Sequence, residues 1–77
     1  MSSIRSNGLR LVVYPNDHPP PHAHVLGSGW EIRIELSMPP ELMTIMGKPK
    51  VAEVTAALMA VDAHLKQLRT YWSQLHD

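Results

Sequence analysis

The chain after Pro49 contains neither glycine nor proline, and its apolar residues recur at steps of three and four. This spacing places apolar side chains on one face of a helix, and the abundance of alanine and leucine favours the same structure. Pro49 itself suits the first position of a helix. The pattern predicts one long helix from Pro49 to about His76. Its apolar stripe consists of Val51, Val54, Leu58, Val61, Leu65, Leu68, Trp72 and Leu75.

The preceding two thirds of the chain carry strand patterns separated by turn residues. Residues Leu9–Tyr14 and His22–Leu26 are extended runs, and Trp30–Leu36 alternates between apolar and polar side chains, which is typical of a half-buried strand. Residues 41–46 predict either a fourth strand or an irregular cover. Residues 1–7 are polar and without periodicity, and they predict a loose terminus. The predicted fold class is therefore α+β: a three- or four-stranded antiparallel β-meander covered on one face by one long C-terminal α-helix.

The composition narrows the class of protein. A chain of 77 residues has room for a single domain, covering residues 1–77. Lysine and arginine balance aspartate and glutamate at seven each, which argues against nucleic-acid binding by charge alone. The lack of cysteine favours a reducing, cytoplasmic location. No apolar run reaches the roughly 18 residues of a membrane span, and no signal peptide is recognisable. A membrane partner is therefore not expected.

The predicted helix is longer than the sheet it covers. A straight helix over residues 50–76 spans about 40 Å, whereas the strand at residues 30–36 covers about 23 Å. The overhanging end would expose Leu68, Trp72 and Leu75 as one apolar patch, which water disfavours. We therefore expect a homodimer, or a small protein partner, at this end of the helix.

A histidine- and proline-rich segment is the one place where the sequence suggests chemistry. Three of the five histidines and four of the seven prolines lie between Pro15 and His24. On a strand, His22 and His24 point to the same face, so their rings can approach one ion. Neutral imidazole suits zinc and other divalent transition metals, and Asp17 is a natural third ligand. Asp17, His22 and His24 are the candidate metal ligands.

Two other interpretations of this segment stay open beside the metal site. His18, His22, His24 and, from the helix, His64 are candidate catalytic residues for general acid–base chemistry, as in phosphodiester hydrolysis. Alternatively, the rings are structural and hydrogen-bond to backbone carbonyls that the prolines leave without ladder partners. Neither cysteine nor a serine in a glycine elbow offers a nucleophile, which disfavours covalent catalysis.

The segment Asn16-Asp17-His18-x-Pro20-Pro21-His22-x-His24 resembles the D/E-H-x-P-P-H-x-H signature of a family of small bacterial proteins, domain of unknown function 4160. Arg5 with Gly8, and His64 with Leu68 and Trp72, fit further positions of the family pattern. The resemblance implies that Arg5, Asp17 and His18 contribute to ligand binding and act together with His22, His24 and His64. It names no reaction. Members are often encoded beside another small protein, which resembles a toxin–antitoxin arrangement.

Two function hypotheses follow. The first is a small cytoplasmic bacterial binding or interaction module, part of a two-gene module similar to toxin–antitoxin pairs, with the histidine–proline loop as a ligand or metal site. The second is a hydrolase, similar to a ribonuclease toxin, that uses the histidines with or without a divalent metal. The sequence does not decide whether the protein is an enzyme.

Overall fold

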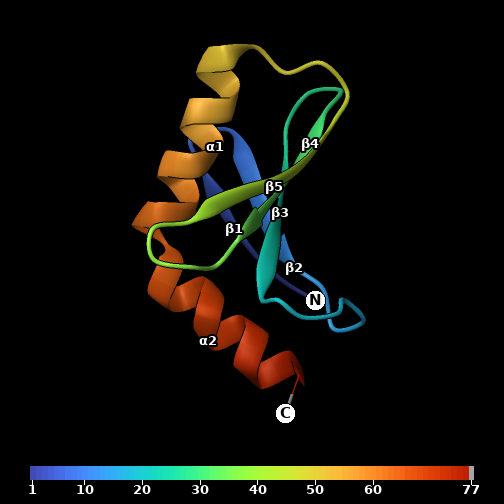
Figure 1. Ribbon diagram of the computed structural model, residues 1–77, viewed down its shortest axis with the longest axis vertical. Coiled ribbons are helices and arrows are strands. Elements are labelled where there is room, and N and C mark those ends of the chain that lie inside the picture. The colour runs from blue at the N-terminus through green and yellow to red at the C-terminus, as the bar shows by residue number, and fades with distance from the viewer. Residues whose placement is uncertain (77) are drawn as a thin grey trace.

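A computed structural model describes residues 1–76, which form one antiparallel sheet and two C-terminal helices (Figure 1). The elements are β1 (Ser2–Ser6), β2 (Leu9–Val13), β3 (His22–Leu26), β4 (Glu31–Glu35), β5 (Glu41–Met46), α1 (Val51–Ala63) and α2 (Leu65–His76). The strands lie in the sheet in chain order, as a meander. The predicted α+β class and antiparallel meander are confirmed, but the sheet has five strands instead of three or four.

The additional strand comes from the N-terminal residues that were predicted to form a loose terminus. Residues Ser2–Ser6 pair with Leu9–Val13 as β1 and β2. Asn7 and Gly8, both with positive φ (49° and 80°), turn the chain between these strands. A two-residue turn with positive φ at both positions matches the twist of an antiparallel hairpin. Ile4 then packs against the core and stabilises the edge strand.

Residues 41–46 form a strand, which was one of the two alternatives for this segment. β5 pairs with β4 from Glu31↔Met46 to Glu35↔Glu41, with a bulge where the register shifts between Arg33 and Ile34. β1 and β5 are therefore the two edges of the sheet.

The single long helix predicted for the C-terminal part is wrong in one respect, because it bends at His64. The backbone N–H of His64 donates to the carbonyls of both Ala60 and Val61, each at 3.2 Å, so α1 ends there with a tightened turn. A strand of five residues spans only about 17 Å, and a straight helix of this length would extend past the sheet. The bend keeps α2 against the core.

The bend also changes the surroundings of the predicted apolar patch. Leu68 and Trp72 are buried (0% and 8% exposed), and Leu75 is half-buried against the same core. The patch therefore does not lie on the surface. Association with a second chain at these residues remains a prediction, but the exposed patch that motivated it is absent. Neither helix within residues 1–76 is long and apolar enough to cross a membrane.

The start of α1 is attached to the sheet by Glu53. Its carboxylate accepts hydrogen bonds from the backbone N–H of Lys50 (2.8 Å) and from Nε1 of Trp30 (3.0 Å). The backbone hydrogen bond from Lys50 and, second, the bond from Trp30 hold the pKa of Glu53 below its ordinary value. An acidic residue in the first turn also favours the helix through its dipole. These bonds fix α1 over the apolar face of the sheet.

Candidate metal centre

The two strand histidines lie on the sheet face opposite the one that carries the core. Ala23 and Val25 belong to the core cluster that contains the helix residues. Since successive side chains of a strand alternate in direction, His22 and His24 point to the opposite face. Both are nevertheless buried, at 7% and 5% exposure.

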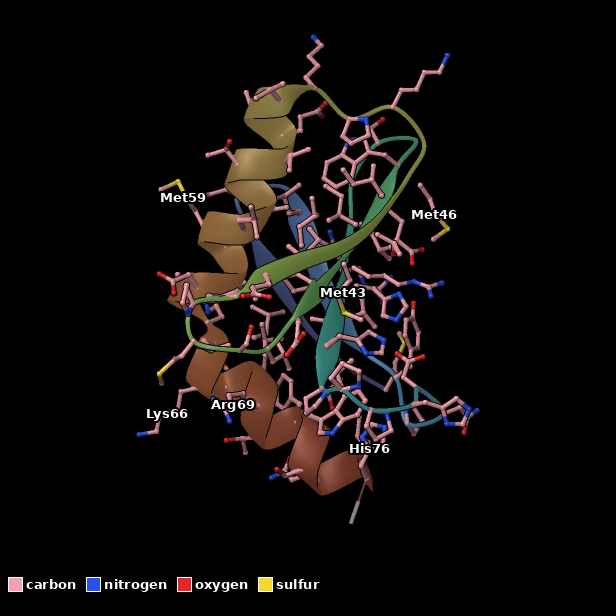
Figure 2. All side chains as sticks on the ribbon, viewed as in Figure 1. Met43, Met46, Met59, Lys66, Arg69 and His76 are labelled. Carbon is pink, nitrogen blue, oxygen red and sulfur yellow. The ribbon has the colours of Figure 1, made fainter. Side chains whose placement is uncertain are left out.

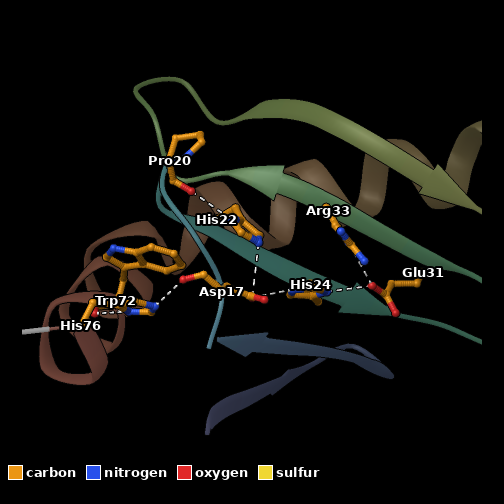
Figure 3. A network of polar contacts seen from close by, with 8 residues as sticks. All are labelled: Asp17, Pro20, His22, His24, Glu31, Arg33, Trp72 and His76. Atoms are coloured by element: carbon orange, nitrogen blue, oxygen red, sulfur yellow. Dashed lines mark hydrogen bonds and ion pairs between the residues drawn. The ribbon is translucent and has the colours of Figure 1, made fainter. Parts of the chain in front are cut away.

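The loop between β2 and β3 brings a carboxylate to these two rings (Figure 3). The backbone N–H of Asp17 bonds to the carbonyl of Tyr14, which turns the chain directly after β2. Asp17 Oδ2 then lies 2.7 Å from Nε2 of His24 and 3.3 Å from Nε2 of His22. The three residues offer ligand atoms that all lie within 4.8 Å of one another. The set predicted from the sequence is therefore assembled in the fold.

The other ring nitrogen of each histidine is held by a separate acceptor. Nδ1–H of His22 donates to the carbonyl of Pro20 (2.9 Å), and Nδ1–H of His24 donates to Oε2 of Glu31 (2.7 Å). Metal-binding histidines use this arrangement, because a bond at one ring nitrogen orients the ring and directs the other nitrogen at the ion. Both Nε2 atoms point to one place, beside Asp17.

The end of α2 closes the site from a second side. The ring of Trp72 lies 5.4 Å from that of His22, and the ring of His76 stacks on Trp72 at 3.6 Å. Nε2 of His76 bonds to the backbone carbonyl of Asp17 at 3.0 Å. The ring of Tyr14 contacts His24 edge-on at 4.8 Å. The bond from His76 joins the C-terminal helix to the Asp17 loop. Within residues 1–76, every buried side-chain nitrogen and oxygen has a hydrogen-bond partner.

Three other predicted site residues lie outside this group. His18 is exposed in the loop after Asp17. His64 is half-buried at the junction of α1 and α2. Arg5 is exposed on β1, paired with Arg10 across the ladder. Among the described residues, the convergent ligand group consists of Asp17, His22 and His24 alone. Arg5, His18 and His64 do not belong to it, so the structure does not support the prediction that all six residues act together.

Three residues at the site were not predicted from the sequence, namely Glu31, Trp72 and His76. Glu31 could have been found from the hairpin between β3 and β4. The hairpin pairs Glu31 with Leu26, which lies two residues after His24 and on the same face of the sheet. Trp72 was assigned to the helix stripe, and nothing local connects it or His76 with a loop more than fifty residues away. Their place depends on the bend at His64.

The fold and the site together define a small α+β protein with a candidate metal centre of two histidines and one carboxylate. The chain belongs to the family described as domain of unknown function, DUF4160, whose model matches residues 8–73. This confirms the resemblance found in the sequence. No curated protein and no solved structure matches the chain.

Proposed function

We propose that this protein is a small metal-dependent binding module, in which Asp17, His22 and His24 hold a divalent transition metal such as zinc. One observation carries the proposal: two imidazole Nε2 atoms converge on a single carboxylate, while both Nδ1 atoms are anchored by acceptors. Two rings anchored to face one point form the first half of a metal site.

The donor set favours a transition metal over calcium or magnesium. Imidazole nitrogen suits zinc, copper, nickel and iron, whereas calcium and magnesium take oxygen ligands. Three protein ligands also leave one position of a tetrahedral zinc ion for water or a bound group. The Asp17 side chain is 23% exposed, so solvent can reach the carboxylate that would hold the metal.

The binding role is preferred to the hydrolase because His64 and His18, which an acid–base mechanism was expected to recruit, lie outside the cluster. We place this role in the cytoplasm, since a chain without cysteine contains no disulfide that would require an oxidising compartment. A small protein encoded beside it, as the family resemblance implies, is the proposed interaction partner.

The first test measures zinc binding to the full chain by calorimetry and by NMR of the histidine rings. We expect one zinc ion per chain, with ring shifts at His22 and His24. Replacing His24 with alanine should weaken the affinity by more than about 100-fold, since removal of a ligand exceeds the 10- to 100-fold cost of losing an outer partner.

His18→Ala is the matched control, because this histidine lies in the same loop but outside the cluster. It should bind zinc like the unmodified chain. Unchanged affinity in both His22→Ala and His24→Ala would overturn the metal site. Cleavage of a short RNA by the zinc-loaded chain, lost in His24→Ala, would favour the hydrolase instead.

A second prediction concerns the outer partner of His24. Replacing Glu31 with alanine removes the acceptor for Nδ1–H of His24, and zinc affinity should fall by about 10- to 100-fold. Titration calorimetry measures the loss. Glu35→Ala is the control, because Glu35 lies on the same strand opposite His22 and carries the same charge. Equal losses in both variants would assign the effect to charge alone and contradict a positioning role for Glu31.

A further inference from the structure

The edge strand β5 is exposed along its whole length although most of its residues are apolar. All six residues of Glu41–Met46 are exposed. Leu42, Met43, Ile45 and Met46 each keep between 39% and 44% of their surface in water. Figure 2 shows Met43 and Met46 along β5, across the molecule from Met59 on α1. An exposed edge strand rich in apolar residues is a template for pairing with another strand.

The other edge of the same sheet has a different composition. β1 has the sequence Ser-Ser-Ile-Arg-Ser, in which Ile4 is its one apolar residue and packs on the core. A polar edge with a charged residue discourages pairing with a further strand. β5 also carries one charged residue, Glu41 at its first position, but four of its six residues are apolar and exposed, and none is lysine or proline. The two edges therefore differ in the property that decides whether a sheet can be extended.

The hydrogen-bond pattern shows which backbone groups β5 offers. At the end of the β3–β4 ladder, the N–H of Leu36 donates to the carbonyl of Pro21 at 2.8 Å. In an antiparallel pair, alternate residues exchange these bonds. Ile32 and Ile34 lie four and two residues before Leu36, so by the same alternation their backbone N–H and C=O groups also point toward β3. The residues between them point toward β5.

The partners of Ile32 and Ile34 in β5 are Ile45 and Leu42. Because Ile32 and Ile34 use their backbone groups on β3, Ile45 and Leu42 direct their own groups to the open edge. An incoming strand bonds at these two positions. The side chains of Leu42 and Ile45 lie on the helix-covered face of the sheet, beside those of their partners Ile34 and Ile32.

We propose that two copies of this chain associate through β5, in an antiparallel pair that joins their sheets into one. A twofold axis that places Leu42 opposite Ile45 of the second copy satisfies the outward backbone groups of both strands. The same register gathers two leucines and two isoleucines into one apolar cluster across the axis, where cross-strand pairs are stabilising.

The charges at the two ends of β5 favour a second copy as the occupant. Glu41 begins the strand and Lys48 follows its end by two residues. In the proposed register, Glu41 lies opposite Met46 of the second copy and diagonal to its Lys48, within reach of a long side chain. The two ends are thus complementary in an antiparallel self-pair. The chain has a formal net charge of zero, so two copies do not repel each other at long range.

The test is the oligomeric state of the full chain by sedimentation equilibrium from micromolar to submillimolar concentration. We expect a monomer–dimer equilibrium. Ile45→Lys should raise the dissociation constant by about 100-fold or more, because it places an ammonium group among apolar side chains of both copies. Met59→Lys, at an even more exposed apolar site on α1, should leave it unchanged. A chain that stays monomeric throughout, or equal effects of both variants, would overturn the proposal.

Two further experiments test the register even if Ile45→Lys folds poorly. The chain has no cysteine, so the double variant Leu42→Cys with Ile45→Cys should form an inter-chain disulfide on mild oxidation. The pair Ser3→Cys with Ser6→Cys on β1 should not. Lys48→Glu should weaken the dimer, and adding Glu41→Lys should restore it. Cross-linking on β1 but not on β5 would contradict the proposed interface, as would a charge exchange without recovery.

Discussion

Replacing Trp72 with alanine should destabilise the protein by about 3–5 kcal/mol, as is usual when a large aromatic side chain is removed from a core. Small domains are stable by only about 5–15 kcal/mol, so this variant should be largely unfolded under mildly denaturing conditions. Trp72 is buried within the core, lies against His22 and is stacked by His76. The substitution therefore removes core volume and one wall of the metal site together.

Urea unfolding followed by circular dichroism measures this effect. Trp72→Phe retains an aromatic ring and should cost less than the alanine variant. Ser73→Ala, at an exposed neighbour on α2, should change stability little. The result also distinguishes a core residue from an interface residue. If Trp72→Ala dissociated an oligomer and left a folded, equally stable chain, Trp72 would belong to an interface, contrary to its burial in a single chain.

Zinc should stabilise the folded chain by about 4 kcal/mol when its free concentration is 1,000 times the dissociation constant, because a ligand that binds only the folded state shifts the folding equilibrium by mass action. The ligand atoms of Asp17, His22 and His24 converge through the turn after β2 and through β3. The unfolded chain lacks this arrangement. Binding free energy at such a site is therefore also folding free energy.

The measurement is the urea midpoint with zinc, with magnesium at the same concentration, and after removal of zinc by a chelator. Zinc should raise the midpoint, the chelator should reverse the change, and magnesium should have little effect because it prefers oxygen ligands. His22→Ala and His24→Ala should lose the response. Equal stabilisation of these variants would show that zinc acts elsewhere on the chain.

The candidate site was partly predictable because its ligands are close together in the chain. His22 and His24 share a face through the two-residue period of a strand, and Asp17 lies five residues before His22. Glu31 comes from the neighbouring strand, so its contact with His24 depends on the register of the β3–β4 hairpin. His76 reaches the backbone of Asp17 only through the path of α2. Its role was not predictable from local patterns.

The details of the predicted fold that were wrong concern segments whose structure depends on neighbouring segments. Ser2–Ser6 has no strong strand pattern, but it becomes β1 because the Asn7-Gly8 turn returns it to β2. The apolar stripe predicted the helical region and its buried face. It contained no proline or glycine to mark the bend at His64.

The sequence by itself determined the α+β class, the antiparallel meander, the helical C-terminal region and the pairing of His22 with His24 on one face. These features follow from side-chain periodicity, which acts over a few residues. Only the tertiary structure decided that the helix bends at His64, that Trp72 is buried beside His22, and that β5 is the exposed apolar edge. The physical reason is one of dimensions: short strands make a small sheet, and a helix longer than this sheet must bend to keep its apolar side chains out of water.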